Sequence, residues 1–248
     1  MSGSGLRLAG VRCAFGAVEV FRDLSLEVAR GEFVAVVGPS GCGKTTLLNL
    51  CSGFVKPAAG VVECAGRVRT VYQQDGLFPW LTVAQNIRLG LRRIANEGER
   101  ERRLGEMLGL IRLENFSGHY PHQLSGGMRQ RAELARALAG DTDVLLLDEP
   151  FSSLDYLTRL RLRGELARML AELPRTVVLV THDIEEAAQL ADRVVVLSDR
   201  PASIVRQLEM RLPRPRDPVH PEVVEAVQLI LAELGLGRDK VEAVTDFS

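Results

Sequence analysis

The sequence predicts an α/β fold built on a mostly parallel β-sheet. Short apolar runs at 143–147, 176–180 and 194–197 are typical of strands that a parallel sheet buries on both faces. Amphipathic stretches with helical periodicity lie between these runs. A further apolar run, 32–37, leads directly into a glycine-rich loop. This order places the loop at the carboxyl edge of the predicted sheet, where α/β folds bind ligands.

The glycine-rich loop fits the pattern G-x-x-x-x-G-K-[ST] of a phosphate-binding loop, and a helix is expected to start directly after it. Glycines let the backbone wrap closely around phosphates, and the helix N-terminus adds a partial positive charge. Lys44 is expected to reach the β- and γ-phosphates, and the Thr45 hydroxyl to ligate Mg²⁺. The expected nucleotide-binding residues here are Gly38, Pro39, Ser40, Gly41, Cys42, Gly43, Lys44, Thr45 and Thr46.

Composition excludes several classes of protein. The net charge is −1, so no global field favours nucleic acid. No apolar run reaches the roughly 18 residues of a membrane span, and residues 1–5 lack the apolar region of a secretion signal. The 4 cysteines form no C-x-x-C pair, so we expect no structural zinc and no disulfide framework. A reducing cytosol fits this pattern, with Cys42 as a free thiol near the phosphates.

Residues 6–37 predict several strands. Residues 6–11 alternate apolar and other side chains, and two further strands are expected at 18–21 and 24–28. Phe15 lies in a turn-like Ala-Phe-Gly stretch. It is either a core residue, the usual fate of an aromatic, or a ring that stacks on adenine, and the spacing alone favours the core.

Strands are again expected at 61–64 and 68–72, and the strand signal then stops between Thr82 and Leu138. Leu104, Met107, Leu108 and Ile111 follow helical spacing, so we expect a helical insertion of roughly 50–60 residues. Trp80, the single tryptophan, lies in the preceding loop. It either caps a local cluster or belongs to a docking surface, since tryptophan is enriched at interaction hot spots.

Two adjacent carboxylates, Asp148 and Glu149, end the apolar run 143–147. Carboxylates at the end of a buried strand are costly unless they are used. We expect Asp148 to hold Mg²⁺ and Glu149 to orient or deprotonate water. His182 follows the apolar run 176–180 and is either structural or a sensor of the γ-phosphate.

A second glycine-containing stretch precedes a predicted helix. Ser125 is a good N-cap, and Gly126 and Gly127 leave backbone N–H groups accessible. The stretch is either simply a capped helix after a glycine turn or a second helix N-terminus that binds an anion. A helical stretch is also expected around 223–234, in a tail too short for a second core of any size.

These motifs occur in a fixed order and together resemble the nucleotide-binding subunit of an ABC transporter. The resemblance covers about residues 6–210 and is strongest to the nitrate/sulfonate/taurine importers, through 77–83, 128–131 and 212–217. It implies an α/β P-loop NTPase core (RecA-like, mostly parallel sheet) with an N-terminal antiparallel β subdomain and a helical insertion. The single domain would comprise a core (about 1–75 and 139–205), a helical subdomain (about 76–138) and a tail (about 206–248).

The resemblance also implies roles for individual residues, with ATP and Mg²⁺ as cofactors. Phe15 would stack on adenine, and Gln73 would touch Mg²⁺ and link to the membrane subunit. The γ-phosphate of ATP held by the opposite subunit would meet Leu124, Ser125, Gly126 and Gly127, with Asp155 coupling the two sites. Catalysis would rest on Glu149, His182 and Gln73, and the metal on Thr45, Gln73 and Asp148.

The implied partners are a second copy in a head-to-tail ATP sandwich, transmembrane permease subunits and, indirectly, a solute-binding protein, with no nucleic acid. The expected location is the cytoplasmic face of the inner membrane. Alternatives are an ATPase for efflux or lipoprotein release, a DNA-repair ABC ATPase and a non-catalytic binding module. The DNA-repair type places coiled coils or zinc modules between the P-loop and the stretch that corresponds to residues 124–127, where this sequence has neither heptads nor cysteine pairs.

Overall fold

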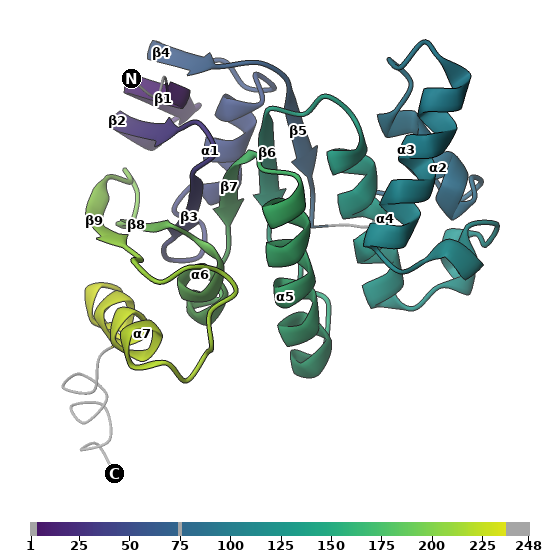
Figure 1. Ribbon diagram of the computed structural model, residues 1–248. Helices are drawn as coiled ribbons and strands as arrows, with labels where there is room; N and C mark the ends of the chain where they lie inside the picture. Colours follow the sequence, from purple (N-terminus) through teal and green to yellow (C-terminus); the bar gives the residue numbers. More distant parts are fainter. Residues whose placement is uncertain (1–3, 74–75, 237–248) are drawn as a thin grey trace. The chain divides into compact units, whose positions relative to one another are not determined.

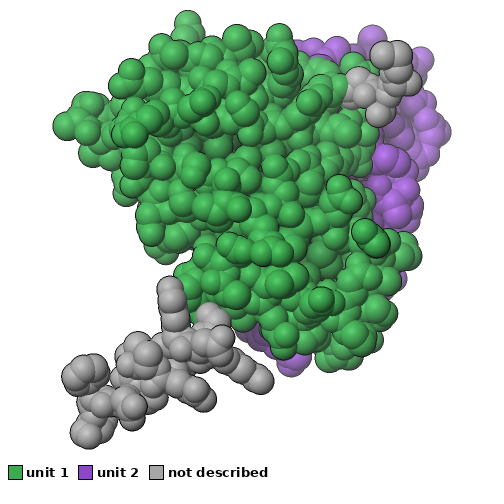
Figure 2. Space-filling view, turned by 90° about the vertical axis from the view of Figure 1, so that its left-hand side faces the viewer, with its two compact units in different colours: residues 1–65, 176–248 green, residues 66–175 purple. Residues whose placement is uncertain are grey.

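The structure is a computed structural model, and it describes residues 4–73 and 76–236 (Figure 1). The chain divides into two compact units, which Figure 2 colours separately. Unit 1 comprises residues 1–65 and 176–248, and unit 2 comprises residues 66–175. The predicted α/β class is confirmed. The finer division into core, helical subdomain and tail stays a prediction.

Unit 1 contains the predicted antiparallel β subdomain. Its strands are β1 (Ser4–Phe15), β2 (Val18–Ala29) and β4 (Ala59–Cys64), in the order β2-β1-β4. The prediction of two strands within 18–28 is wrong, because β2 is continuous. The pairing register between β1 and β2 shifts near its middle, where Arg22 and Asp23 are both exposed. This irregularity interrupts the alternation of buried and exposed side chains along β2. The sequence of this one strand therefore looks like two strands separated by a gap.

The second sheet of unit 1 holds the predicted parallel strands. β3 (Phe33–Val37) lies between β7 (Thr176–Val180) and β8 (Arg193–Leu197) and is parallel to both. β9 (Ile204–Glu209) pairs antiparallel with β8. Every residue of β3 and β7 is buried, which explains their unbroken apolar sequences. These strands position the loops that follow them at one edge of the sheet.

Three helices lie among the described residues of unit 1. α1 (Lys44–Cys51) follows β3 and contacts β4 and β7, while α6 (Ile184–Leu190) contacts β3 and α7 (Pro221–Glu233). The helix predicted around 223–234 is thus confirmed. No helix within the described residues is long and apolar enough to cross a membrane.

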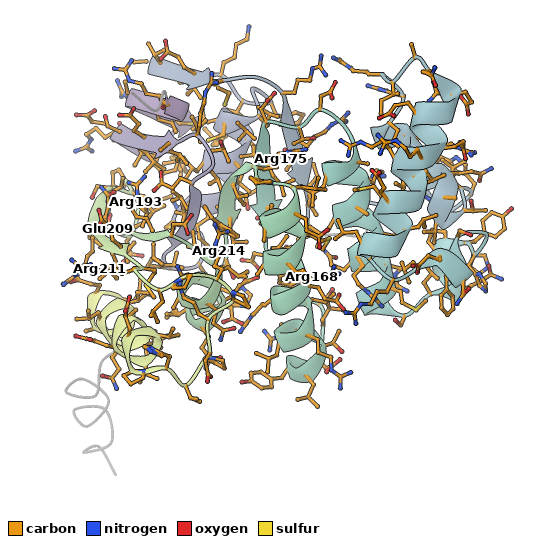
Figure 3. All side chains as sticks on the ribbon, viewed as in Figure 1. Arg168, Arg175, Arg193, Glu209, Arg211 and Arg214 are labelled. Atoms are coloured by element: carbon orange, nitrogen blue, oxygen red, sulfur yellow. The ribbon has the colours of Figure 1, made fainter. Side chains whose placement is uncertain are left out.

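Arginines fix the carboxyl end of α6. Arg216 is buried and donates from Nη1 to the Ala191 carbonyl at 2.6 Å and from Nε to the Leu212 carbonyl at 2.8 Å. Arg214, which is labelled in Figure 3, has its Nη2 3.2 Å from Asp192 Oδ2. Cations near a helix C-terminus are favourable, and here they also satisfy carbonyls at that end. The amino end of α6, next to His182, therefore belongs to a well-anchored element.

Unit 2 contains two parallel strands, β5 (Val68–Val71) and β6 (Val144–Asp148), and the predicted helical insertion. Its helices are α2 (Val83–Gly90), α3 (Glu97–Leu110), α4 (Gly126–Ala139) and α5 (Tyr156–Glu172), with short 3₁₀ turns η1 (Glu114–Phe116) and η2 (Pro121–Gln123). The predicted apolar face is confirmed, since Leu104, Met107, Leu108 and Ile111 are all buried. α2 packs against α4.

Candidate functional site

The phosphate-binding loop of unit 1 curves around the side chain of Lys44. Lys44 is the first residue of α1, and its Nζ donates to the Gly38 carbonyl at 2.8 Å and the Pro39 carbonyl at 3.0 Å. The N–H of Cys42 donates to the Pro39 carbonyl at 3.2 Å. Lys44 as a whole is only 8% exposed. The loop thus holds a cation within its own curve, at the start of a helix.

Glycine is required at position 43. Gly43 has a φ of +122°, and a Cβ there would lie 2.4 Å from Val20 Cγ1. The residues next to it differ in accessibility: Ser40 and Thr45 are exposed, whereas Cys42 is buried. Helix N-termini leave their first N–H groups without intrahelical acceptors. The exposed side of the loop therefore presents donors and a hydroxyl to an anion.

The Cys42 thiol is free and packs into the interior of unit 1. Burial raises its pKa, and the opposing effect of the Lys44 ammonium only partly offsets this. A thiol with a raised pKa is a poor nucleophile at neutral pH. Cys42 is thus a packing residue of the loop.

Phe15 is 52% exposed, so the core position that its spacing favours is wrong. It ends β1 and pairs with Val18, the first residue of β2, at the tip of the β1–β2 hairpin. Val18 is itself exposed. At the tip the strands extend past the buried core, and the aromatic ring stays accessible. The adenine-stacking role stays a prediction.

His182 lies between β7 and α6, in a turn held by hydrogen bonds on both sides. Thr181 Oγ1 donates to Glu186 Oε2 at 2.5 Å. Asp183 caps α6 by accepting from the Glu186 N–H at 3.0 Å. His182 itself is exposed. The sequence predicted that His182 follows a buried strand, and the structure places it in an exposed, hydrogen-bonded turn.

In unit 2 the structure brings Gln73 and Glu149 together. Gln73 Nε2 lies 3.4 Å from Glu149 Oε2 and 3.2 Å from Ser152 Oγ. The Ser152 hydroxyl in turn donates to the Glu149 carbonyl at 3.0 Å. Glu149 has a φ of +45°, a left-handed conformation that costs a residue with a Cβ about 1 kcal/mol or more. Such strain is typical of functional positions. Asp148, which precedes it and ends β6, is 7% exposed.

Ser125 is the predicted N-cap of α4, and this prediction is confirmed. Its hydroxyl accepts from the Met128 N–H at 3.3 Å. A Cβ on Gly126 would lie 2.9 Å from Leu154 Cδ2, and one on Gly127 would lie 3.1 Å from Thr158 Cγ2. A side chain at either position would crowd these neighbours. The two glycines therefore let the start of α4 approach the start of α5.

Asp155 caps that second helix. Its carboxylate accepts from the Thr158 N–H at 3.0 Å, and hydrogen bonding to Thr158 lowers its pKa. The next two residues, Tyr156 and Leu157, are 52% and 63% exposed. Unit 2 thus presents two neighbouring capped helix N-termini beside a pair of exposed apolar side chains.

Asn86 is a structural residue that sequence reasoning missed. It is fully buried, and its Nδ2 donates to the Leu81 carbonyl at 3.0 Å and the Phe78 carbonyl at 3.2 Å. Its Oδ1 accepts from the Phe78 N–H at 2.8 Å. The sequence signal that could have pointed to this role is an asparagine one helical turn after the Thr82 cap. Asn86 fixes the loop that presents Trp80, which is 68% exposed with its ring 5.4 Å from that of Phe78.

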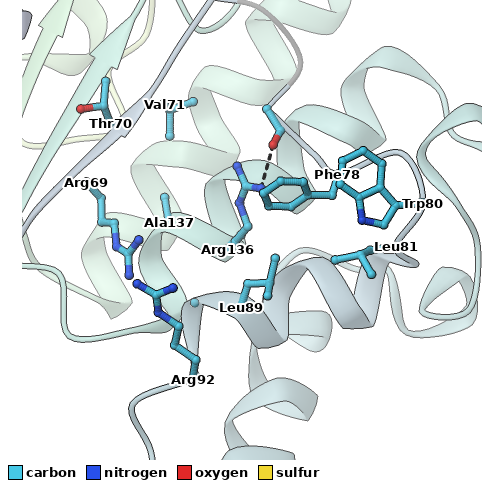
Figure 4. Close-up of a pocket in the computed structure, with 12 residues that line it drawn as sticks. Arg69, Thr70, Val71, Phe78, Trp80, Leu81, Leu89, Arg92, Arg136 and Ala137 are labelled. Carbon is cyan, nitrogen blue, oxygen red and sulfur yellow. Dashed lines mark hydrogen bonds between the residues drawn. The ribbon is translucent and has the colours of Figure 1, made fainter.

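This loop borders a cavity of about 500 Å³ within unit 2 (Figure 4). The lining residues come from β5, the loop, α2, the turn that follows α2, and α4: Arg69, Thr70, Val71, Gly76, Phe78, Trp80, Leu81, Leu89, Gly90, Arg92, Arg136 and Ala137. Figure 4 shows the side chains of Arg69 and Arg92, which both line this cavity. Neither has a hydrogen-bond or ion-pair partner among the residues that the structure describes.

The cavity is linked to the helix that Ser125 caps. Arg136 Nη1 donates to the Gly76 carbonyl at 2.7 Å, and Glu133 Oε2 accepts from the Gly76 N–H at 3.1 Å. Both side chains project from α4. Burial and the nearby Arg69 lower the pKa of Arg136, while Glu133 raises it. The cavity therefore combines arginine side chains with aromatic and apolar ones.

A lysine-bearing P-loop between a buried strand and a helix, on an α/β fold, defines a nucleotide-binding protein of the P-loop class. The family model described as ABC transporter matches residues 21–152, and the chain belongs to the ABC transporter family. Within that family it is similar to the ATP-binding component. This confirms the resemblance predicted from the motifs.

Several relatives are named as ATP-binding proteins of import systems. The chain is 46% identical over 218 residues to an aliphatic sulfonates import ATP-binding protein of Rhodococcus jostii, covering 86% of each chain. It is 41% identical to a taurine import ATP-binding protein of Yersinia pestis, covering 83% of this chain and 84% of the relative. A nitrate import ATP-binding protein of Synechococcus elongatus is 44% identical over 81% of this chain and 32% of its own length.

Among solved structures, the chain is similar to a bacterial ABC transporter cassette determined as a dimer. The TM-score is 0.71 at 31% identity, covering 84% of this chain and 99% of the cassette. A post-hydrolysis form of that cassette, bound to ADP and phosphate, has a TM-score of 0.70. These likenesses confirm the predicted P-loop ATPase fold.

Proposed function

We propose that this protein hydrolyses ATP to power an ABC importer for sulfonates, taurine, nitrate or a similar small solute. The observation that carries the proposal is the P-loop, with Lys44 Nζ held between two loop carbonyls at the start of α1. A triphosphate is the ligand that suits this cation, these glycines and this helix terminus. The import direction and the solute classes rest on the relatives.

The roles of individual residues follow from their chemistry. The Thr45 hydroxyl, the Gln73 amide and the Asp148 carboxylate are oxygen donors of the kind that Mg²⁺ prefers, and Mg²⁺ would neutralise developing charge on the phosphates. Glu149 orients the attacking water and accepts its proton. Gln73, 3.4 Å from Glu149, holds that carboxylate in place. His182 contacts the γ-phosphate from its rigid turn, and Phe15 stacks on adenine through its exposed ring.

A second copy of the chain completes the nucleotide site. Two adjacent helix N-termini on unit 2, capped by Ser125 and Asp155, suit an anion that the partner's P-loop presents. The exposed side chains of Tyr156 and Leu157 lie next to these caps and supply apolar contact area. The dimeric state of the similar solved cassette supports this arrangement. ATP binding closes the dimer, and hydrolysis reopens it.

The cavity of unit 2 binds a cytoplasmic segment of the membrane permease. Phe78, Trp80 and Leu89 offer apolar and aromatic contacts, the chemistry of interaction hot spots. Arg69 and Arg92 favour a segment that carries a carboxylate, because both guanidinium groups line the same cavity. The bonds from α4 to Gly76 connect this cavity to the helix capped by Ser125. A docked segment would thereby be coupled to the nucleotide site.

The protein would thus work at the cytoplasmic face of the inner membrane, with a solute-binding protein delivering the solute to the permease. No role for nucleic acid follows from the site. Import is favoured over efflux or lipoprotein release because the relatives are import proteins.

Uptake by cells tests this function. A strain that lacks the gene, complemented with wild type, should take up labelled taurine, an alkanesulfonate or nitrate. Complementation with Arg92→Glu should lower uptake about tenfold or more, since it places a carboxylate against the acidic docking segment. Its ATP hydrolysis as an isolated chain should stay unchanged.

Arg93→Glu is the matched control. Arg93 is the exposed neighbour of Arg92 and does not line the cavity. Uptake with this variant should equal that of wild type. If deletion of the gene leaves uptake of all three solute classes intact, the importer assignment is wrong. If Arg92→Glu and Arg93→Glu behave alike, the docking cavity is wrong while the importer assignment stands.

A further inference from the structure

The loop after β8 lies against the P-loop and is held firmly. A Cβ on Gly38 would lie 3.1 Å from both Cβ and the carbonyl oxygen of Leu197, the last residue of β8. The N–H of Ser198 donates to the Ser203 carbonyl at 2.9 Å, and the N–H of Ala202 donates to the Val20 carbonyl at 2.8 Å. Residues between these bonds therefore have a defined place beside the nucleotide loop.

Arg200 projects from this loop onto the tip of the P-loop. Its Nη2 lies 3.1 Å from the position that a Cβ on Gly41 would occupy. Arg200 and Gly41 are both exposed. Within the described part of the chain, the Arg200 guanidinium has no hydrogen-bond or ion-pair partner. An arginine on a flexible stem, without a partner, would normally extend into water. This one instead rests on a loop that is built for phosphates.

The charges around the loop tip favour an anion at Arg200. Lys44 is buried within the loop and bonded to its carbonyls, so it does not occupy the exposed side. The charge of Asp199, the residue before Arg200, contributes to the raised pKa of Cys42 after the larger effect of burial. A carboxylate alone there would repel a polyphosphate. The guanidinium next to it offsets that charge and offers several donors in a planar fork, the geometry that suits phosphate oxygens.

We propose that Arg200, which lies at the tip of the P-loop beside Gly41, binds the polyphosphate of the nucleotide together with Lys44. This inference rests on the proposed nucleotide function of the loop and adds a residue outside its motif. The contact is made to phosphate oxygens and not to the adenine base. Arg200 is a binding residue, and its loss should weaken affinity without disturbing the fold.

The test compares wild type, Arg200→Ala and Arg200→Lys in equilibrium binding of ATP, ADP and inorganic tripolyphosphate. Arg200→Ala should weaken all three about tenfold, the loss of one charge-assisted hydrogen bond. Arg200→Lys should recover part of the affinity because the charge remains. The control is Arg30→Ala, which removes an equally exposed arginine at the turn before β3, away from the loop. It should bind every ligand as wild type does.

The outcomes separate the possibilities. If Arg200→Ala weakens ATP but leaves tripolyphosphate unchanged, the contact is to the nucleoside and the proposal is overturned. If it changes neither ligand while wild type binds ATP, the proposal is wrong and the P-loop function stands. If wild type itself binds no nucleotide, the proposed function fails first. A melting temperature equal to that of wild type shows that the variant is folded.

Discussion

Glu149→Gln should retain ATP affinity and lower the steady-state turnover by about 10² or more. An amide has nearly the same shape but cannot accept a proton from water. The side chain can still receive the Gln73 Nε2 contact, because the amide oxygen replaces a carboxylate oxygen 3.4 Å away. Without hydrolysis the closed dimer should persist, so an ATP-bound dimer should accumulate on a sizing column.

A suitable control is Glu209→Gln, which makes the same chemical change at an exposed residue at the end of β9. It should leave turnover and oligomeric state unchanged. Near-normal turnover of Glu149→Gln would remove Glu149 from its assigned role. The strained φ at this residue would then need another explanation.

A second large effect is expected in mixed dimers of Lys44→Ala and Ser125→Arg. Lys44→Ala removes the cation from its own P-loop, whereas Ser125→Arg blocks the helix N-terminus offered to the partner. Each nucleotide site of the dimer combines the P-loop of one chain with the Ser125 helix N-terminus of the other. In the mixed dimer both substitutions fall in the same site, and the other site is intact. The mixed dimer should therefore retain about one nucleotide, compared with two for wild type.

Homodimers of each variant serve as controls, because both of their sites are damaged and neither should retain nucleotide. If the purified mixed dimer also retains none, either Ser125 acts on the P-loop of its own chain or the two sites cannot load independently. Either finding would argue against the sandwich arrangement.

Local patterns made most of the fold predictable. Apolar runs gave β3, β7 and β8 because a parallel sheet buries both faces of each strand. Helical spacing identified the buried face of α3, and Ser125 was recognisable as a cap from its side chain and the glycines that follow. The candidate site could be predicted because each of its motifs is a short continuous stretch of sequence.

What the sequence did not reveal depends on contacts between distant residues. Phe15 is exposed because the hairpin tip lies beyond the core, a property of the strand pairing rather than of its neighbours. Asn86 acquires its role from carbonyls of the preceding loop. Arg200 stands far from the P-loop in sequence, and only the closeness of β8 to β3 brings it to Gly41.

The central claim is that this chain is an ATPase whose P-loop holds the triphosphate through Lys44. Release of phosphate from Mg²⁺-ATP by the purified chain, compared with Lys44→Ala, tests it most directly. We predict release by wild type that depends on Mg²⁺ and falls by about 10² or more in the variant, since the variant lacks the cation that stabilises negative charge on the transferred phosphoryl group. Equal release by the two proteins, or none by wild type, would contradict the account.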